Sequence, residues 1–317
     1  MGSAVVIDTG GWTVSASQRS NFRNAFELTA YLAARATLGR GGPGLIEPMG
    51  SVLGSLFHRL ARRRREIILF NLALAYPDLS EEEREHMALE VGRHFGRALM
   101  GTLRLQRMMP EKFLRSVTVE GQENLDMVAA GTRGAFFLSA HLGAWEVAAL
   151  YVGLALSGGI GVVNRPLDNP LLEAELEGFR KRFGNRTLGK KAALRSMLSD
   201  IKAGRSVGIL IDQKPGPNDQ GVEVPFFGHT APAHSILARI VLKTQTPVIP
   251  AFAYAERGGR FTLSLGSPVP VEPNDDVTSL TARYMAVTEE AIRQRPEQWL
   301  WYHDRWQEIR RAQSEQR

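Results

Sequence analysis

The chain has 317 residues and a hydrophobic content of 44%, which suits one large α/β domain or two small ones and excludes a protein of many membrane spans. It contains no cysteine, so disulfides, thiol nucleophiles and Cys-ligated metals are excluded. The 39 basic side chains exceed the 33 acidic ones. The resulting charge of +6 suits phosphate-bearing ligands, acidic proteins, an anionic membrane leaflet or simply a basic soluble enzyme.

Residues 1–20 show little apolar periodicity and lack the basic-then-apolar order of a signal peptide, so we expect a mobile N-terminal segment. Residues Asn24 to Leu38 place apolar side chains at helical spacing until "GRGGPG" interrupts them. A weakly apolar segment, the basic cluster Arg62 to Arg65 and a second apolar helix follow. This pattern is typical of an anchor lying in the membrane interface, and equally of amphipathic helices packed on the domain with their arginines in water.

A long helix is expected after Ser80, which is a suitable N-cap followed by three glutamates in the first turn, where the helix dipole favours them. Beyond about residue 115 short apolar runs alternate with helical ones. The predicted strands cover residues 117–120, 134–140, 159–163, 206–211, 247–254 and 260–265. The predicted helices between them cover about 144–156, 169–184, 189–203, 231–244 and 277–294.

This alternation predicts an α/β fold with a mostly parallel central sheet flanked by helices. Residues 21–110 would form a helical, membrane-associating region, and residues 111–317 an α/β core that is continuous with it as one domain. The longest stretch without charged residues runs from Val147 to Asn164, and it includes "SGGIG". That motif indicates a helix end, a turn and a strand, so no clean membrane span is expected.

Polar residues follow three of the predicted strands. His141 comes directly after the strand 134–140, and Glu146 falls in the first turn of the next helix. Ligands of open α/β sheets collect at the carboxyl ends of the strands. An imidazole hydrogen-bonded to a carboxylate is a general base with a fixed tautomer, although a structural histidine beside a helix-start glutamate fits the same pattern.

The other two strands end in similar side chains. Asn164 and Arg165 follow the strand 159–163, Asp212 and Gln213 follow the strand 206–211, and Arg180 lies near the end of a helix. Arginine binds phosphate or carboxylate in a bidentate manner, but a single arginine taken alone is more often a surface charge. Because the carboxyl ends of parallel strands meet at one edge, these residues together predict a substrate site.

Other chemistries fit the sequence poorly. Ser139 lacks the G-x-S-x-G elbow of a serine hydrolase, and no motif of a metal site, a Walker A loop or a dinucleotide-binding loop is present. Nucleic acid is not an expected partner, because basic residues are not interleaved with aromatic ones outside "QWLWYHDRW", which core packing also explains.

Several segments occur in an order that identifies a family. They are "RRRREIILFNLALAYPDLSEEER", "HLGAWE", "NRPLDNPLLEAELEGFRKRFG", "DQKPG", "VPFFG", "PVIPAFAY" and "RPEQWLWYHDRWQ". Between about Ala61 and Trp306 the chain resembles the bacterial lipid A late acyltransferases, the lauroyl and myristoyl transferases of the glycerolipid acyltransferase superfamily.

This resemblance implies transfer of an acyl chain from acyl-carrier protein or acyl-CoA to a hydroxyl of a membrane glycolipid, with no cofactor. His141 and Glu146 match the catalytic H-x4-E dyad, in which the histidine takes the proton and Glu146 orients it. Arg180 and Asp212 match family residues that organise the site or bind substrate. The helix 144–156 and the N-terminal helices would line a groove for the acyl chain.

Two departures from the family pattern refine these expectations. Charged residues interrupt the N-terminal anchor, namely Glu27, Arg35, Arg40 and Glu47. We therefore expect peripheral or monotopic association with the cytoplasmic face of the bacterial inner membrane. The "DQKPG" and "PFFG" segments differ from the "FPEGTR"-like phosphate motif, which counts against a lysophosphatidic-acid acceptor. A phosphatidylinositol mannoside or lysophospholipid acceptor, or a lipid-binding protein without catalysis, remain as alternatives.

Overall fold

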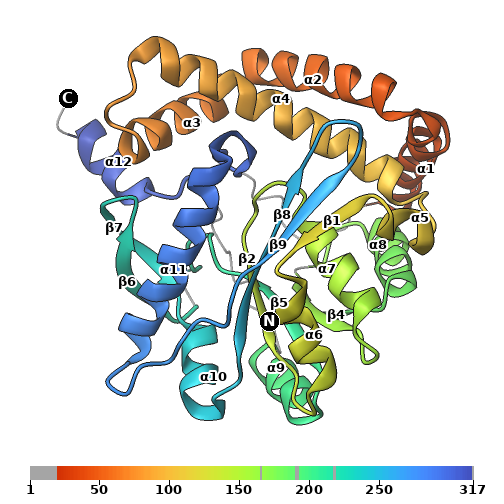
Figure 1. The fold of residues 1–317 in the computed structure, drawn as a ribbon. Coiled ribbons are helices and arrows are strands. Elements are labelled where there is room, and N and C mark those ends of the chain that lie inside the picture. The colour runs from red at the N-terminus through yellow and green to blue at the C-terminus, as the bar shows by residue number, and fades with distance from the viewer. Residues whose placement is uncertain (1–19, 165, 190–192, 217–218, 316–317) are drawn as a thin grey trace, which may run out of the picture.

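A computed structural model describes residues 20–164, 166–189, 193–216 and 219–315 (Figure 1). Arg165, a predicted substrate-binding residue, lies outside the described residues, as do residues 1–19 of the predicted mobile N-terminal segment. No described helix is both long enough and apolar enough to cross a membrane.

The core is a seven-stranded sheet. From edge to edge its strands are β1 (Val117–Glu120), β9 (Phe261–Leu265), β8 (Val248–Ala255), β2 (Phe136–Ser139), β5 (Ser206–Leu210), β3 (Ile160–Asn164) and β4 (Asn185–Gly189). The five strands from β8 to β4 run parallel, whereas β9 and β1 run the opposite way. The predicted α/β fold with a mostly parallel sheet is confirmed. The edge strand β4 was not predicted, because its sequence "NRTLG" has no apolar run.

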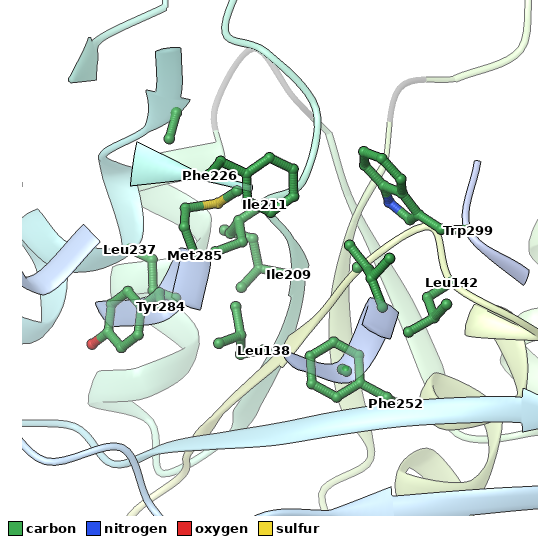
Figure 2. Packing of buried hydrophobic residues seen from close by; sticks show 14 of the residues in the cluster. Leu138, Leu142, Ile209, Ile211, Phe226, Leu237, Phe252, Tyr284, Met285 and Trp299 are labelled. Atoms are coloured by element: carbon green, nitrogen blue, oxygen red, sulfur yellow. The ribbon is translucent and has the colours of Figure 1, made fainter. Parts of the chain in front are cut away.

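Both faces of the sheet are covered by helices, and β2 shows why its sequence is a continuous apolar run. All four residues of β2 are buried, because successive side chains point to opposite faces. Phe137 packs in one cluster with α7 (Trp145–Ala155) and α6 (Gln122–Ala130). Leu138 packs on the other face, where Figure 2 shows it near Ile209, Leu237, Tyr284 and Met285.

Four of the remaining helices correspond to predicted ones. They are α8 (Pro170–Arg182), α9 (Ala193–Lys202), α10 (Ile236–Thr244) and α11 (Val277–Gln294). The chain also contains the short helix α5 (Pro110–Leu114) and the C-terminal helix α12 (Gln307–Glu315).

An antiparallel hairpin, β6 (Gly221–Phe226) and β7 (His229–His234), lies where no strand was predicted and replaces the start of the helix predicted over 231–244. Alternate side chains of the hairpin are buried, Val224 and Ala231 among them, which is the period of a strand. Phe227 and Gly228 form the two-residue turn with positive φ angles of 51° and 75°. Such turns favour Asn-Gly or Asp-Gly, so Phe-Gly gave no turn signal.

The N-terminal helices are α1 (Asn21–Thr37), α2 (Pro43–Leu60), α3 (Arg62–Ala75) and α4 (Glu81–Leu105). Ser80 and Glu83 form the capping box of α4, as its sequence predicts. Ile68 and Leu72 of α3 and Val91 of α4 belong to the same buried cluster as the sheet. In Figure 1 these helices extend over the end of the sheet from which the β8–β9 hairpin projects.

Helix α2 lies against α4 at very short range. A Cβ atom on Gly54 would be 2.0 Å from the carbonyl oxygen of Gly92, and one on Gly96 would be 2.0 Å from that of Gly50. Only glycine permits this approach, so the face of α2 that carries Gly50 and Gly54 packs directly on α4. Its outer face leaves Val52, Leu53, Leu56 and Leu60 exposed.

Candidate active site

The carboxyl ends of β2 and β5 bring two predicted site residues together. Ser139 pairs in register with Leu210, so His141 and Asp212, each two residues further on, are neighbours. Asp212 Oδ1 lies 2.9 Å from His141 Nδ1, and Asp212 Oδ2 accepts the backbone N–H of His141 at 3.0 Å. The same Oδ2 accepts the indole N–H of Trp299 at 2.8 Å. The carboxylate therefore fixes the imidazole through both the ring and the backbone.

This pair is electrostatically coupled. Asp212 is only 1% exposed. Burial alone would raise the pKa of this carboxyl, but His141 and the hydrogen bonds from His141 and Trp299 lower it to about 2. Burial likewise lowers the pKa of His141, but the Asp212 carboxylate outweighs burial and raises it above its ordinary value. Asp212 is thus ionised at neutral pH and favours the imidazolium form of His141.

The other ring nitrogen of His141 faces a cavity of about 1450 Å³. Gln213 Nε2 approaches His141 Nε2 at 3.5 Å, which is long for a hydrogen bond. The cavity is also lined by the predicted residues Asn164, Glu146 and Arg180, and by Ser139. The predicted residues outside this lining are Asp212, which lies behind His141, and Arg165, which is not described.

Glu146 does not pair with His141 as the sequence predicts. Its carboxylate binds Arg180 of α8 in a bidentate manner, with Nη2–Oε1 at 2.6 Å and Nε–Oε2 at 3.3 Å. Among the described residues the imidazole bonds instead to Asp212. The physical reason is position: Glu146 lies in the first turn of α7, where Arg180 reaches it, whereas Asp212 extends the strand next to that of His141.

Arg180 has one nitrogen, Nη1, without a hydrogen-bond partner among the described residues. Its side chain is 14% exposed, and Nη1 itself is buried. A guanidinium that is held on one edge by a carboxylate and unpaired on the other can bind a further anionic oxygen. No three described His, Asp or Glu side chains cluster in the way that a metal ion would require.

The cavity extends from this polar rim into an apolar interior. The sheet contributes Phe137, Ile160 and Val162, and α7 contributes Ala148 and Val152. These residues lie between α7 and the face of the sheet that it covers, so the predicted role of this helix in lining an apolar groove matches its position. Arg63 and Arg64 of α3 line the polar part, together with Lys214 and residues of α12.

Two further site residues come from the C-terminal segment, where the sequence suggested core packing. Trp299 is buried and fixes Asp212, and its backbone bridges to Leu142. His303 lines the cavity and accepts the backbone N–H of Lys214 at 3.2 Å. Burial lowers the pKa of His303 to about 4, so this ring is neutral at physiological pH. The only sequence signal for both was the aromatic motif "RPEQWLWYHDRWQ".

Comparison with known proteins gives a consistent result. A family model described as "Bacterial lipid A biosynthesis acyltransferase" matches residues 19–308. The lipid A biosynthesis lauroyltransferase of Escherichia coli K12 is 30% identical over 265 residues, covering 82% of this chain and 85% of the relative. The myristoyltransferase of the same strain is 26% identical over 286 residues, covering 89% and 87%. The palmitoleoyltransferase is 29% identical over 266 residues, covering 81% and 83%.

Proposed function

Since the chain belongs to the bacterial lipid A biosynthesis acyltransferase family and is therefore an acyltransferase, we propose that it transfers a fatty acyl chain to a hydroxyl of a lipid A-like membrane glycolipid. The donor would be a thioester, acyl-carrier protein or acyl-CoA. The observation that carries the mechanism is the 2.9 Å contact between His141 Nδ1 and Asp212 Oδ1. It leaves Nε2 of the imidazole at the cavity as a proton acceptor.

In the reaction, His141 Nε2 takes the proton of the acceptor hydroxyl while the oxygen attacks the thioester carbonyl. Asp212 holds the required tautomer and stabilises the imidazolium that forms. The tetrahedral intermediate then expels the thiolate, which recovers the proton from the imidazolium. The products are the ester and the free thiol, and no covalent intermediate forms on the enzyme.

We assign Glu146 and Arg180 to the oxyanion rather than to the base. Arg180 lines the same cavity as His141, and Glu146 fixes the Nε–Nη2 edge of its guanidinium, while the buried Nη1 has no hydrogen-bond partner among the described residues. A fixed cation directed at the charge that develops in the transition state lowers its energy without reorganisation. Glu146 thus stays in the catalytic site, acting through Arg180.

The apolar interior of the cavity would hold the acyl chain, between α7 and the sheet. Asn164 and Gln213 at the rim would contact the polar parts of the donor or acceptor. The printed names of the relatives differ in their acyl group, lauroyl, myristoyl and palmitoleoyl, so family membership leaves the chain length open.

The exposed outer face of α2 supports association with a membrane surface. Leu53, Leu56 and Leu60 are exposed on it, and the basic residues Arg62 and Arg63 follow directly. An apolar helix face with basic flanks suits the interface of an anionic leaflet. We place the protein at the cytoplasmic face of the inner membrane, bound in a peripheral or monotopic manner.

The test is thiol release from a long-chain acyl thioester by the purified chain, with and without vesicles containing a lipid A-type acceptor, and mass spectrometry of the lipid. Acceptor-dependent thiol release with a matching gain of one acyl chain supports the proposal. Lipid binding without thiol release would favour the non-catalytic alternative. A covalent acyl-enzyme lost in Ser139→Ala would favour a serine hydrolase.

A further inference from the structure

Arg305 is a buried arginine without a hydrogen-bond partner. It is 0% exposed, and Nε, Nη1 and Nη2 all lack partners among the described residues. Its guanidinium carbon lies 5.3 Å from the centre of the Phe226 ring, a cation–π contact that offsets part of the loss of hydration. Burying five N–H donors and a charge is unfavourable unless something in the interior compensates.

The other buried charges among the described residues indicate which group compensates the charge of Arg305. Apart from histidines, the described charged side chains that are buried are Asp200, Asp212 and Arg305. Asp200 is neutralised by Arg186 at 3.0 Å and Arg205 at 2.7 Å. Asp212 bonds only to the imidazole and to neutral N–H donors, and no described carboxylate oxygen lies within 4.0 Å of Arg305. One anion and one cation therefore remain.

These two charges are connected through an aromatic cluster. The Phe226 ring that lies under Arg305 is 5.7 Å from the Trp299 ring, and Trp299 donates its indole N–H to Asp212. Figure 2 shows Phe226 and Trp299 among the buried side chains of this region. Charges separated by packed hydrophobic side chains are screened far less than charges in water, so they interact over such distances.

We infer that Arg305 is the buried counter-charge of Asp212 and acts through this carboxylate as a positioning residue for His141. The inference rests on the proposed function, because His141 is the base. A cation behind Asp212 keeps the carboxylate ionised and opposes a second positive charge on His141. The imidazole therefore stays neutral, and active as a base, down to a lower pH than Asp212 alone would allow.

The other charged groups near this set are few. Burial lowers the pKa of Arg305 to about 10, and the carboxylates that partly offset burial are Asp212 first, then Glu223 of β6 and Glu308 of α12. Lys214 and the neutral ring of His303 line the cavity, and the Lys214 ammonium pairs with Glu308 at 3.3 Å. Arg305 therefore remains charged throughout the pH range in which His141 titrates.

The first test compares the pH dependence of thiol release in Arg305→Met and Arg305→Lys. Methionine keeps much of the side-chain length and removes the charge, so the acid limb should move up by about one pH unit. Lysine restores part of the positive charge, so the acid limb of Arg305→Lys should move less than that of Arg305→Met. A purely structural role would lower turnover without moving the limb, and an unmoved limb in folded Arg305→Met overturns the inference.

The second test needs no activity, so it is independent of the proposed function. Melting temperatures of Arg305→Met, Asp212→Asn and the double variant form a double-mutant cycle. Arg305→Met should lower the melting temperature less in the Asp212→Asn background, where the arginine has lost its counter-charge, than in the wild type. Equal decreases in both backgrounds overturn the inference. If Arg305→Met alone does not fold, a folded double variant supports the inference and an unfolded one overturns it.

Discussion

Asp212 holds His141 at two points, the imidazole Nδ1 at 2.9 Å and the backbone N–H at 3.0 Å, although 71 residues separate the two in the chain. The contact follows from the register of β2 and β5, in which Ser139 pairs with Leu210. A carboxylate bound at two points, and to Trp299 at a third, cannot rotate away from the ring. The base of the proposed reaction is therefore preorganised by the sheet.

Replacing Asp212 with asparagine should reduce turnover by about 10³-fold or more, because the amide cannot stabilise the imidazolium and allows the wrong tautomer. Thiol release at saturating donor measures the effect. Asp78→Asn, which changes an exposed aspartate outside the cavity lining, should leave turnover unchanged. Near-normal turnover in a folded Asp212→Asn protein would exclude Asp212 as the partner of the base.

Loss of the Glu146–Arg180 pair should reduce turnover by about 10²-fold, because an oxyanion donor loses its orientation. Glu146→Gln and Arg180→Lys should have similar effects, since lysine cannot form the bidentate contact. Their double variant should be little worse than either single one, as expected of residues that act as a unit.

The exposed i,i+4 pair formed by Glu177 and Lys181 on α8 is a matched control, and Glu177→Gln should be silent. The assay also separates the two roles considered for Glu146. If Glu146 oriented His141 directly, Glu146→Gln would shift the acid limb of the pH profile as well as lowering its height. If Glu146 acts through Arg180, Glu146→Gln should lower the maximal turnover and leave the pH of the acid limb unchanged.

The pH dependence of turnover should show an acid limb above the ordinary histidine value of about 6.5, because the pKa of His141 is raised and the base must be neutral. Asp212, with its pKa lowered to about 2, stays ionised over this range. Thiol release measured from pH 5 to 9 would locate the limb, and a limb well below 6.5 would contradict the coupling between the two residues.

The free energy of unfolding should also depend on pH through His141 and Asp212, in opposite directions. Protonated His141 stabilises the fold below its unfolded pKa of about 6.5, and this contribution is lost as the pH rises through the higher folded value. Asp212 stabilises the fold above about pH 3.9 and this contribution disappears as the pH falls toward 2. Urea titrations of wild type and Asp212→Asn at several pH values would show a larger acid-side loss of stability in the wild type, because both proteins share the losses from other carboxylates of lowered pKa, such as Asp200 and Asp275.

A larger side chain in the apolar interior should shorten the accepted acyl chain. Ala149 of α7 lines the cavity, so Ala149→Phe should raise KM for long donors by about tenfold or more while a short acyl donor is less affected. A series of acyl thioesters of increasing length is the measurement. Leu154→Phe, on the same helix but outside the cavity lining, is the control. Equal effects on all chain lengths would exclude this groove as the acyl site.

Polar substitutions on the outer face of α2 should weaken membrane binding. Leu53 is 46% exposed, and Leu53→Ser together with Leu56→Ser should reduce binding to anionic vesicles by about tenfold or more, because each buries apolar surface in the interface. Leu171→Ser, on a residue of α8 that is 42% exposed, is the matched control. Flotation with anionic and neutral vesicles measures the effect, and unchanged flotation of the double variant would exclude this face.

The sequence by itself determined the layers of the fold. Strands β2, β5 and β8 are short apolar runs buried on both faces, and α4 and α11 have helical periodicity, so local pattern and length were sufficient to locate them. The same pattern placed His141 and Asp212 at the strand ends, where a ligand site is expected. It failed for β4, β6 and β7, whose polar or glycine-containing sequences become strands only through pairing.

Only the tertiary structure decided which side chains act together. The H-x4-E spacing favoured Glu146 as the partner of His141, yet register between β2 and β5 supplies Asp212, and the start of α7 directs Glu146 to Arg180. Trp299 reaches Asp212 from a segment far along the chain, and Arg305 of the same segment packs on Phe226. Hydrogen bonds depend on positions within a few tenths of an ångström, and sheet register and helix packing set these positions, whereas sequence spacing sets only which residues lie near an edge.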